Sequence, residues 1–440
     1  MEKKPFRMTS KVLIAILSIG LLNSIVFTIP YIKYTFYYGM LELTGCTNEQ
    51  LGLLMTIYGL GEVFSLPIGG LLAEKFDVRK ILLISTMGTG LLCFLIVFFP
   101  SYFTTALVWC GLIFTSLFMF WGAIFKSLRI LAPAEYQGRA NGLYSGASGV
   151  GYFVINMAMV PVYNYFSTKS DGQGMRAVFV FFGFLCFIIA GFCCFAVSAA
   201  LKEQKENGWV ILDTTSEQKP SGLKGLWTEF KAVAKYKAVW IFGICLFCVY
   251  GLQISVSYTT SYFTEVLGIT VTFGVVLSVM RSYGMQALGA PVGGFIADKI
   301  GSPSKVVIVG NIAAGLCLLA VMLLPVGAMK LPFLMAVVLI TAWFNGMCYG
   351  VQFAIPAEGR VPAGLAASAV CFGSAIGYIP DVFEHALFGK WLDQCGNQAY
   401  TAIFTYGIGV AVIASIALAY FLISKKKDKL LIGGAASEQA

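Results

Sequence analysis

The chain contains one segment twice, half a chain length apart. Residues 67–75 read Pro-Ile-Gly-Gly-Leu-Leu-Ala-Glu-Lys and residues 291–299 read Pro-Val-Gly-Gly-Phe-Ile-Ala-Asp-Lys, an offset of 224 positions. Shorter matches recur at nearly the same offset: Tyr58-Gly59 with Tyr283-Gly284, Pro133-Ala134-Glu135 with Pro356-Ala357-Glu358, Gly138-Arg139 with Gly359-Arg360, and Gly151-Tyr152 with Gly377-Tyr378. The sequence therefore predicts a duplicated unit.

Both copies are hydrophobic. Hydrophobic residues make up 58% of the 440 positions and charged residues only 12%, about half the charged fraction of an ordinary soluble domain. This composition predicts an integral membrane protein surrounded by the lipid bilayer. The apolar runs reach the roughly 20 residues that a membrane-spanning helix needs, and the alternating polarity of a barrel strand is absent.

We expect six spans in each copy, twelve in all. They cover about 11–32, 49–73, 80–100, 103–130, 141–167, 177–201, 238–262, 270–297, 304–326, 331–355, 364–389 and 399–424. The predicted fold class is an all-α membrane protein with two six-helix bundles, related by a pseudo-two-fold axis along the membrane normal.

The lysines and arginines predict the orientation, because cytoplasmic loops keep positive charge. With the N-terminus inside, the basic residues on the cytoplasmic side are Lys3, Lys4, Arg7, Lys11, those of the 75–80 loop and of residues 202–237, and Lys425, Lys426, Lys427 and Lys429. The outer loops then hold only Lys33, Lys169, Arg176, Lys330 and Lys390. Both termini are expected in the cytoplasm. The net charge of +9 then reflects topology, and no nucleic-acid partner is expected.

The polar segments set the domain boundaries. We expect an N-terminal bundle over 1–201, a cytoplasmic linker over 202–237, a C-terminal bundle over 238–424 and a cytoplasmic tail over 425–440, disordered from Gly433. The amphipathic residues 226–233 predict a helix at the membrane interface. The linker is too short for a catalytic domain.

The sequence does not predict an enzyme or a cofactor. It contains no phosphate-binding loop of the G-x-x-x-x-G-K-[ST] type and no nucleophile–base arrangement. His385 is the one histidine among 440 residues, and no cysteine lies in a metal-ligand cluster, so no metal is expected. Cys46 and Cys395 both fall on the expected outer side, and the sequence leaves open whether they pair. We expect a monomer.

The repeated Gly-x-x-x-[Asp/Glu]-[Lys/Arg] turn, which follows the second and the eighth spans, resembles the signature loop of the major facilitator superfamily. The resemblance covers the whole chain. The first copy departs from the family pattern in having Glu74 for the usual aspartate and Asp77 where glycine is common, whereas the second keeps Asp298 and Gly301. The resemblance implies transport by alternating access, with a cytoplasmic latch that breaks when the carrier opens inward. The residues it assigns to the latch are Gly70, Glu74, Lys75, Arg79, Gly294, Asp298 and Lys299. The alternative is that the basic residues of this loop only determine the orientation of the chain in the membrane.

Two further stretches narrow the resemblance. Residues 358–362 (Glu-Gly-Arg-Val-Pro) and 377–381 (Gly-Tyr-Ile-Pro-Asp) are similar to those of a group of bacterial permeases typified by YihN, which is grouped with sugar-phosphate and oxalate/formate carriers. This likeness implies organic anions as substrates and the bacterial cytoplasmic membrane as the location.

We expect the substrate site near mid-membrane between the two halves. Ionisable residues there cost roughly 2.5–3.5 kcal/mol each on insertion scales, so they point to function. Arg281 lies 13 residues before Gly294, about 20 Å along a helix. Its guanidinium can grip a carboxylate or phosphate with two parallel hydrogen bonds. Arg281 is therefore the leading candidate ligand of an anion, and the alternative is a structural ion pair.

Other residues have weaker claims to the site. Lys126 and Arg129 share a helix face, but both can also snorkel to the cytoplasmic interface. Glu62 can carry a proton or pair with Arg281 or Lys126. Aromatic and amide candidates for the lining are Tyr31, Tyr34, Trp121, Tyr250, Gln253 and Tyr258.

The eleventh span carries three polar residues near its outer end. Asp381, Glu384 and His385 are expected to form a gate or a solvated rim. Pro380 should weaken or kink the helix there.

These features predict a secondary transporter of a small organic anion, a symporter or antiporter coupled to protons or to anion exchange. Two alternatives stay open. A cation or drug exporter of the same fold would be favoured if Glu62 faced the cavity and Arg281 did not. A transporter-like membrane sensor would need a cytoplasmic docking surface, for which residues 202–237 are a thin candidate. The sequence does not give the substrate, the coupling ion or the direction of transport.

Overall fold

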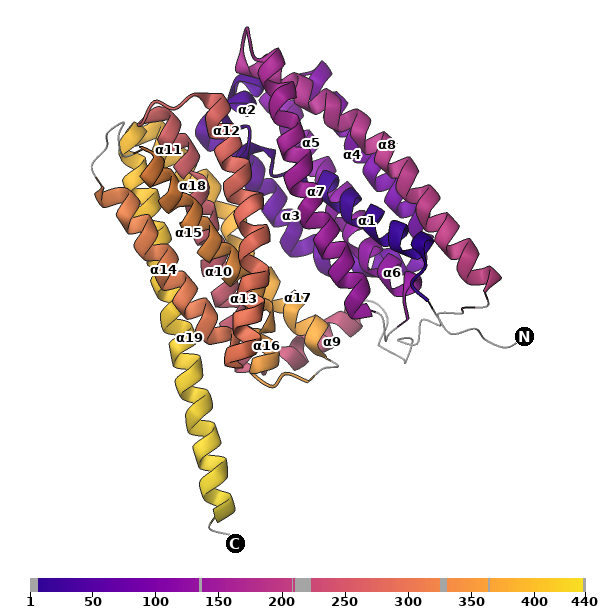
Figure 1. The fold of residues 1–440 in the computed structure, drawn as a ribbon, viewed down its shortest axis with the longest axis vertical. Coiled ribbons are helices and arrows are strands. Elements are labelled where there is room, and N and C mark those ends of the chain that lie inside the picture. Colours follow the sequence, from indigo (N-terminus) through magenta and orange to yellow (C-terminus); the bar gives the residue numbers. More distant parts are fainter. Residues whose placement is uncertain are drawn as a thin grey trace. The chain divides into compact units, whose positions relative to one another are not determined.

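The structure is a computed structural model that describes residues 7–133, 137–207, 209, 223–324, 331–362 and 365–437. Every regular element in these ranges is helical (Figure 1). The chain divides into two compact units. The first comprises Met1–Leu223, Val271–Val279 and His385–Lys390, and the second comprises Lys224–Thr270, Met280–Glu384 and Trp391–Ala440.

The first unit is built around α1, which packs against α7 and α8, while α4 packs along α8. Its helices are α1 (Ser10–Thr28), η1 (Ile32–Tyr34), α2 (Tyr37–Thr44), α3 (Asn48–Lys75), α4 (Val78–Phe98), α5 (Tyr102–Leu112), the π-helical η2 (Ile113–Trp121), α6 (Gly122–Leu131), α7 (Gln137–Phe166), α8 (Asp171–Glu206) and the separate α12 (Val271–Val279). Hydroxyl and carboxylate N-caps start several of them. Thr47 forms a capping box with Gln50 at α3, and Asp77 caps α4.

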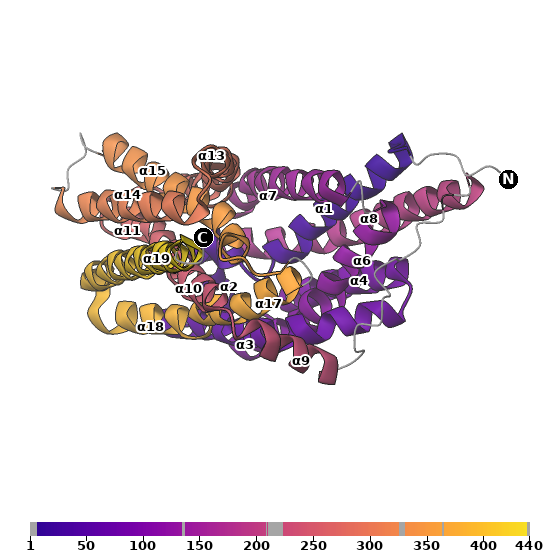
Figure 2. The ribbon, with the colours of Figure 1, turned by 90° about the horizontal axis from the view of Figure 1, so that it is seen from below.

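In the second unit α14 lies between α15 and α19, and α10 packs against α17 and α19 (Figures 1 and 2). The remaining contacts of the unit include α13 on α15. Its helices are α9 (Leu223–Val233), α10 (Lys237–Ser257), α11 (Thr259–Glu265), the π-helical η4 (Met280–Gly284), α13 (Met285–Ile300), α14 (Pro303–Leu323), α15 (Leu331–Val351), η6 (Gln352–Ala354), α16 (Ile355–Glu358), α17 (Ala366–Gly377), α18 (Ile379–Cys395), η8 (Gly396–Gln398) and α19 (Ala399–Ser437). Residues His385–Lys390 of α18 are counted with the first unit.

Small residues bring helices of one unit close together. At Gly20 a Cβ atom would lie 2.7 Å from the Cβ of Ala147, so α1 and α7 could not approach as closely with a larger residue. At Gly289 a Cβ would overlap the carbonyl oxygen of Trp343, where α13 meets α15. Such contacts are how helices associate when lipid removes the hydrophobic driving force.

Within the described residues helix lies in each of the twelve predicted spans, and several of the spans are interrupted. The fourth contains the π-helical η2 and the eighth contains η4. The seventh breaks at Tyr258, between α10 and α11, and the eleventh breaks at Tyr378, between α17 and α18. Pro380 stands in the first turn of α18, so the expected weakening of this span is confirmed as a break. Among the described residues nine helical segments are long and apolar enough to cross a membrane, and one of them, Ser368–Lys426, contains both the eleventh and the twelfth spans.

The linker and the tail are more helical than the sequence suggested. The amphipathic stretch 226–233 lies in α9, as expected, and its interfacial position stays a prediction. The prediction of disorder from Gly433 is wrong up to Ser437, because α19 continues through the lysines that follow its apolar part (Figure 1).

Candidate functional site

A carboxyl group and three tyrosines form the polar centre of the first unit. Glu62 of α3 is only 7% exposed, and its Oε1 accepts a hydrogen bond of 2.5 Å from the hydroxyl of Tyr31. The Tyr31 ring stacks on Tyr34, with centroids 5.9 Å apart and planes at 6°, and meets Tyr58 edge-on at 5.6 Å. The short turn η1 after α1 aligns Tyr31 and Tyr34 on one side. The structure thus brings together three of the predicted lining residues, Tyr31, Tyr34 and Glu62.

The π-helical η2 supplies the next wall of this centre. Its Ser116 hydroxyl is hydrogen-bonded to Tyr58 at 2.7 Å, and Trp121 ends the element with its ring edge-on to Phe27 at 5.7 Å. A π turn widens the helix and re-aims its side chains, and such turns are frequent at functional sites. Trp121, another predicted lining residue, is half-buried here.

A polar seam that the sequence analysis did not single out joins α1 to α7. The amide nitrogen of Asn23 donates to Ser148 at 2.6 Å and to the Tyr152 hydroxyl at 3.3 Å. One turn on, the amide nitrogen of Asn156 donates to Thr28 at 3.3 Å. Buried amides are costly unless they are hydrogen-bonded. The recurrence of Gly151-Tyr152 as Gly377-Tyr378 was the signal that could have marked this seam.

The second unit has its own tyrosine–carboxyl centre. The hydroxyl of Tyr250 on α10 donates to Oδ2 of Asp381 at 2.8 Å, and its ring meets Tyr378 edge-on at 5.1 Å. The hydroxyls of Tyr378 and Tyr349 are 2.9 Å apart. The helix break at Tyr378 places Asp381 in the first turn of α18, where the helix dipole favours a carboxylate. Tyr250 was predicted to line the site, and its partner Asp381 was not.

Of the two roles expected for the polar residues of the eleventh span, the solvated rim is wrong and the gate stays a prediction. Asp381, Glu384 and His385 have no exposed surface. Glu384 accepts a hydrogen bond of 2.6 Å from the Tyr406 hydroxyl on α19, and the Nε2 atom of His385 lies 2.8 Å from the Tyr34 hydroxyl, within the first unit. A hydropathy profile reflects the charge of such residues, but it does not show the hydrogen-bond partners that allow them to be buried.

Arg281 is buried in the π-helical η4, with 3% of its surface exposed. It belongs to the same unit as the Tyr250–Asp381 pair. Of the other candidates on this side, Tyr258 is 4% exposed and Gln253 is half-buried. A buried guanidinium keeps its charge at any cellular pH and therefore requires anionic or polar surroundings.

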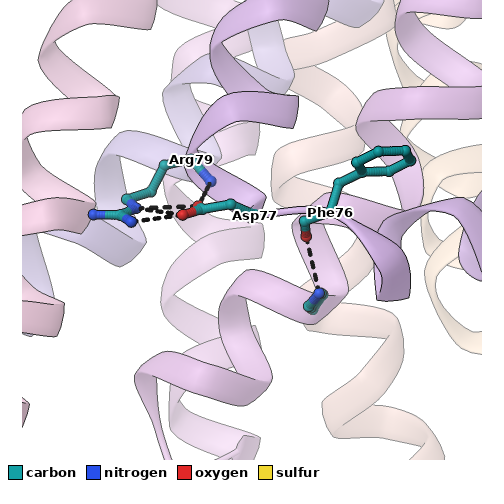
Figure 3. A network of polar contacts seen from close by, with 4 residues as sticks. Phe76, Asp77 and Arg79 are labelled. Carbon is teal, nitrogen blue, oxygen red and sulfur yellow. Dashed lines mark hydrogen bonds and ion pairs between the residues drawn. The ribbon is translucent and has the colours of Figure 1, made fainter.

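The first signature loop is tied down by charged side chains (Figure 3). Arg79 Nη2 lies 2.5 Å from Asp77 Oδ2, and its backbone N–H donates to Asp77 Oδ1 at 2.9 Å. These hydrogen bonds from Arg79 lower the pKa of Asp77 from 3.8 to about 2. The ammonium of Lys126 donates a hydrogen bond of 3.0 Å to the carbonyl oxygen of Phe76, the residue at the C-terminal end of α3. Lys126, predicted as a substrate ligand, thus holds a loop at a helix C-terminus, where a cation is favourable.

The second signature loop is held by Glu358, which the sequence analysis placed only in a repeated motif. Its carboxylate accepts from the Ser302 hydroxyl at 2.7 Å and from the hydroxyl and backbone N–H of Ser304 at 2.6 and 3.0 Å. Lys425 lies 3.5 Å from the same carboxylate. Glu358 therefore caps the N-terminus of α14 from a neighbouring helix.

The remaining latch residues are placed only in part. Gly294 is half-buried and Lys299 is exposed on α13. The predicted site residues Gly70, Glu74, Lys75, Arg129 and Asp298 lie on helices but outside the residues whose side chains are described. Within the described part of the chain no group of three His, Cys, Asp or Glu side chains could hold a metal ion, and Cys46 and Cys395 are both free thiols.

Comparison with known proteins gives a consistent result. The family model described as Major Facilitator Superfamily matches residues 12–383. The inner membrane protein YihN of Escherichia coli K12 is 26% identical over 414 residues, which cover 92% of this chain and 94% of that protein. The inner membrane protein YqcE of the same organism is 24% identical, with 91% and 92% coverage. The membrane sensor protein UhpC, also from Escherichia coli K12, is 24% identical over 309 residues, with 68% and 66% coverage.

Two solved structures have the same fold. A bacterial homologue of the lysosomal transporter Spinster, described as inward-facing and unoccupied, superposes with a TM-score of 0.68 at 17% identity, covering 95% of this chain and 97% of that one. The nucleoside transporter NupG superposes with a TM-score of 0.64 at 15% identity, with 94% and 98% coverage. At such identities the likeness concerns the fold, which is the twelve-helix, two-domain fold predicted from the sequence.

Proposed function

Because the chain belongs to the Major Facilitator Superfamily, whose members are membrane transporters, we propose that it carries a small organic anion across the bacterial inner membrane by alternating access, as a symporter or an antiporter. The inner-membrane location is supported by the apolar helices and by the relatives named inner membrane proteins. The distribution of lysine and arginine supports a cytoplasmic position for both termini as part of this proposal.

The observation that carries the proposal is the burial of Arg281. A charged residue inside an apolar helical segment raises the free energy of membrane insertion, so such residues usually have a function. Arg281 lies in a π turn, the kind of local irregularity found at functional sites. A fixed positive charge with a planar, forked donor set recognises a carboxylate or phosphate. The hydroxyls of Tyr250, Tyr349 and Tyr378 in the same unit offer the neutral hydrogen bonds that orient such a substrate.

The test begins with thermal-shift screening of the purified protein against organic acids and sugar phosphates. Uptake of a radiolabelled hit into proteoliposomes is then measured for the wild type, Arg281→Lys and Arg281→Ala. Arg281→Lys keeps the charge but loses the planar fork, so uptake should fall. Arg281→Ala should weaken binding further, by roughly 2–5 kcal/mol if the anion is left buried and unpaired.

The matched control is Arg176→Lys, because Arg176 is an exposed arginine on α8. This variant should transport at the wild-type rate. Wild-type uptake by Arg281→Ala would exclude Arg281 as an anion ligand. Loss of folding in both Arg281 variants would favour the structural ion pair instead.

A membrane sensor is the second candidate, and the relative UhpC favours it because its name is membrane sensor protein. A sensor of this fold would bind the anion and respond to it without accumulating it. Binding in the thermal-shift screen, combined with no uptake by the wild-type protein under any imposed ion gradient, would support the sensor over the carrier. A cation or drug exporter would instead be supported if the same screen, extended to organic cations, gave hits only among compounds that carry positive charge.

A further inference from the structure

Two carboxyl groups lie one turn apart on α18, and their surroundings differ. Asp381 accepts from Tyr250 and takes part in further interactions. Glu384 accepts one hydrogen bond, from Tyr406 to Oε1, while its Oε2 atom is buried without a hydrogen-bond partner among the described residues. Neither side chain has exposed surface. Glu384 is therefore the more poorly compensated of the two.

The surroundings of Glu384 in the second unit contain no compensating cation within the described ranges. On α10 the backbone approaches so closely at Gly251 that a Cβ there would lie 2.6 Å from Glu384 Oε1. The titratable groups that interact with Glu384 are the Cys248 thiol of α10, the Tyr258 phenol that follows α10, the Tyr406 phenol of α19 and Asp381 on its own helix. All of them are neutral or acidic. An ionised carboxylate is heavily penalised in such a place, and a proton removes the penalty.

We propose that Glu384 is a proton-binding site through which the carrier couples substrate movement to a proton. The physiological role rests on the proposed transport function, whereas the site itself does not. In one state of the carrier the carboxylate takes a proton from a hydronium ion, so that an O–H bond forms at Glu384 and one breaks in the hydronium. In the other state the proton returns to water.

Tyr406 can form a hydrogen bond with Glu384 in both protonation states of the carboxyl group. A phenol can donate a hydrogen bond to the carboxylate, as it does here to Oε1, or accept a hydrogen bond from the carboxylic acid through its oxygen. It therefore positions Glu384 without fixing its charge. A lysine or arginine in the same place would hold Glu384 permanently ionised.

The same unit offers a matched control. The Tyr400 hydroxyl donates to Glu265 Oε2 at 2.8 Å, a tyrosine–glutamate pair of the same chemistry, but Glu265 is exposed at the end of α11. Glu384 is buried and Glu265 is exposed, so a difference in protonation between the two pairs can be attributed to burial.

The experiment is infrared difference spectroscopy of the full-length protein in detergent as the pH is varied, with the proton as the only ligand. The wild type should show the carbonyl stretch of a protonated, buried carboxylic acid at neutral pH. Glu384→Gln should lose this band, and Glu265→Gln should keep it. Tyr406→Phe should move the midpoint of the band to higher pH, because the ionised form loses its donor, whereas Tyr400→Phe should leave the midpoint unchanged.

Persistence of the full band in Glu384→Gln would overturn the proposal. If Glu384→Gln does not fold, Glu384→Asp and Tyr406→Phe decide, since an unmoved midpoint in both variants would equally overturn it. The spectra need no substrate, so a band assigned to Glu384 without anion transport would reject the proposed function and keep the proton site. With a transported anion available, Glu384→Gln should lose accumulation driven by an inward proton gradient and retain exchange. Loss of both would contradict a coupling role.

Discussion

At the scale of single residues, the donors around each acidic side chain distinguish its role. Glu384 accepts from one tyrosine, whereas Glu358 accepts three hydrogen bonds and lies beside Lys425. Carboxylates with several donors stay ionised and hold structure, while those with one neutral donor can change protonation. Glu358 is therefore assigned to the stability of the second unit.

Glu358→Ala should destabilise the protein by roughly 1.5–3 kcal/mol, because it removes charge-assisted hydrogen bonds and the cap of α14. The measurement is thermal or denaturant unfolding in detergent. The control is Glu206→Ala, since Glu206 is exposed at the end of α8 and lies 3.9 Å from Lys202. That variant should lose less than about 1 kcal/mol. Equal losses of stability in the two variants would contradict a stabilising role for the hydrogen bonds that Glu358 accepts.

The sequence predicted candidate residues better than it predicted their partners. Arg281 and Glu62 were found because charge inside an apolar run is visible in the sequence, and both are buried. The partner of Glu384 was not predictable, because Tyr406 lies 22 residues away on the next helix. Lys126 was expected near the substrate, but its contact with the Phe76 carbonyl depends on where α3 ends, which hydropathy leaves uncertain by several residues.

At the scale of elements, hydropathy located the helices, while local chemistry decided their continuity. Pro380 indicated the break in the eleventh span, because proline lacks the backbone N–H that would continue the preceding helix and its ring clashes with the carbonyl group four residues earlier. The break after α10 and the π turns of η2 and η4 had no such marker. The residues of η2 are largely apolar like those of regular helix, and the polar residues of η4, such as Arg281 and Ser282, mark a candidate site and not a π turn, so the residue pattern does not distinguish these elements.

Close helix contacts in the first unit depend on glycine. A Cβ at Gly52 of α3 would overlap the carbonyl oxygen of His385, so Gly52→Ala should destabilise this packing by about 1–3 kcal/mol. Gly149→Ala is the control, because nothing lies within 4 Å of a Cβ at Gly149 on α7. It should be neutral or stabilising by about 0.5–1 kcal/mol, through better helix propensity. The stability of both variants is compared by unfolding in detergent. Wild-type stability of Gly52→Ala would contradict the tight contact.

At the scale of the whole molecule, the duplicated sequence and the family fold agree on twelve spans, an even number that places both termini on one side. The lysines near the C-terminus, such as Lys425 and Lys426, predict that this side is the cytoplasmic one. Fusions to the C-terminus test this orientation in a bacterial host. A green fluorescent protein should fluoresce there and an alkaline phosphatase should stay inactive, and the reverse pattern would refute the assignment.

The π turn at Arg281 has a consequence for the length of the chain. A π-helical turn closes its hydrogen bonds over five residues, one more than an α-helical turn, so η4 holds one residue beyond what a regular helix would need. Deleting a single residue within Met280–Gly284 would let the helix continue as a regular α-helix. A deletion elsewhere in α13 would turn one face of the helix away from α15, on which it packs. In the helix that carries Arg281, we therefore expect a one-residue deletion to be tolerated within η4 and not within α13.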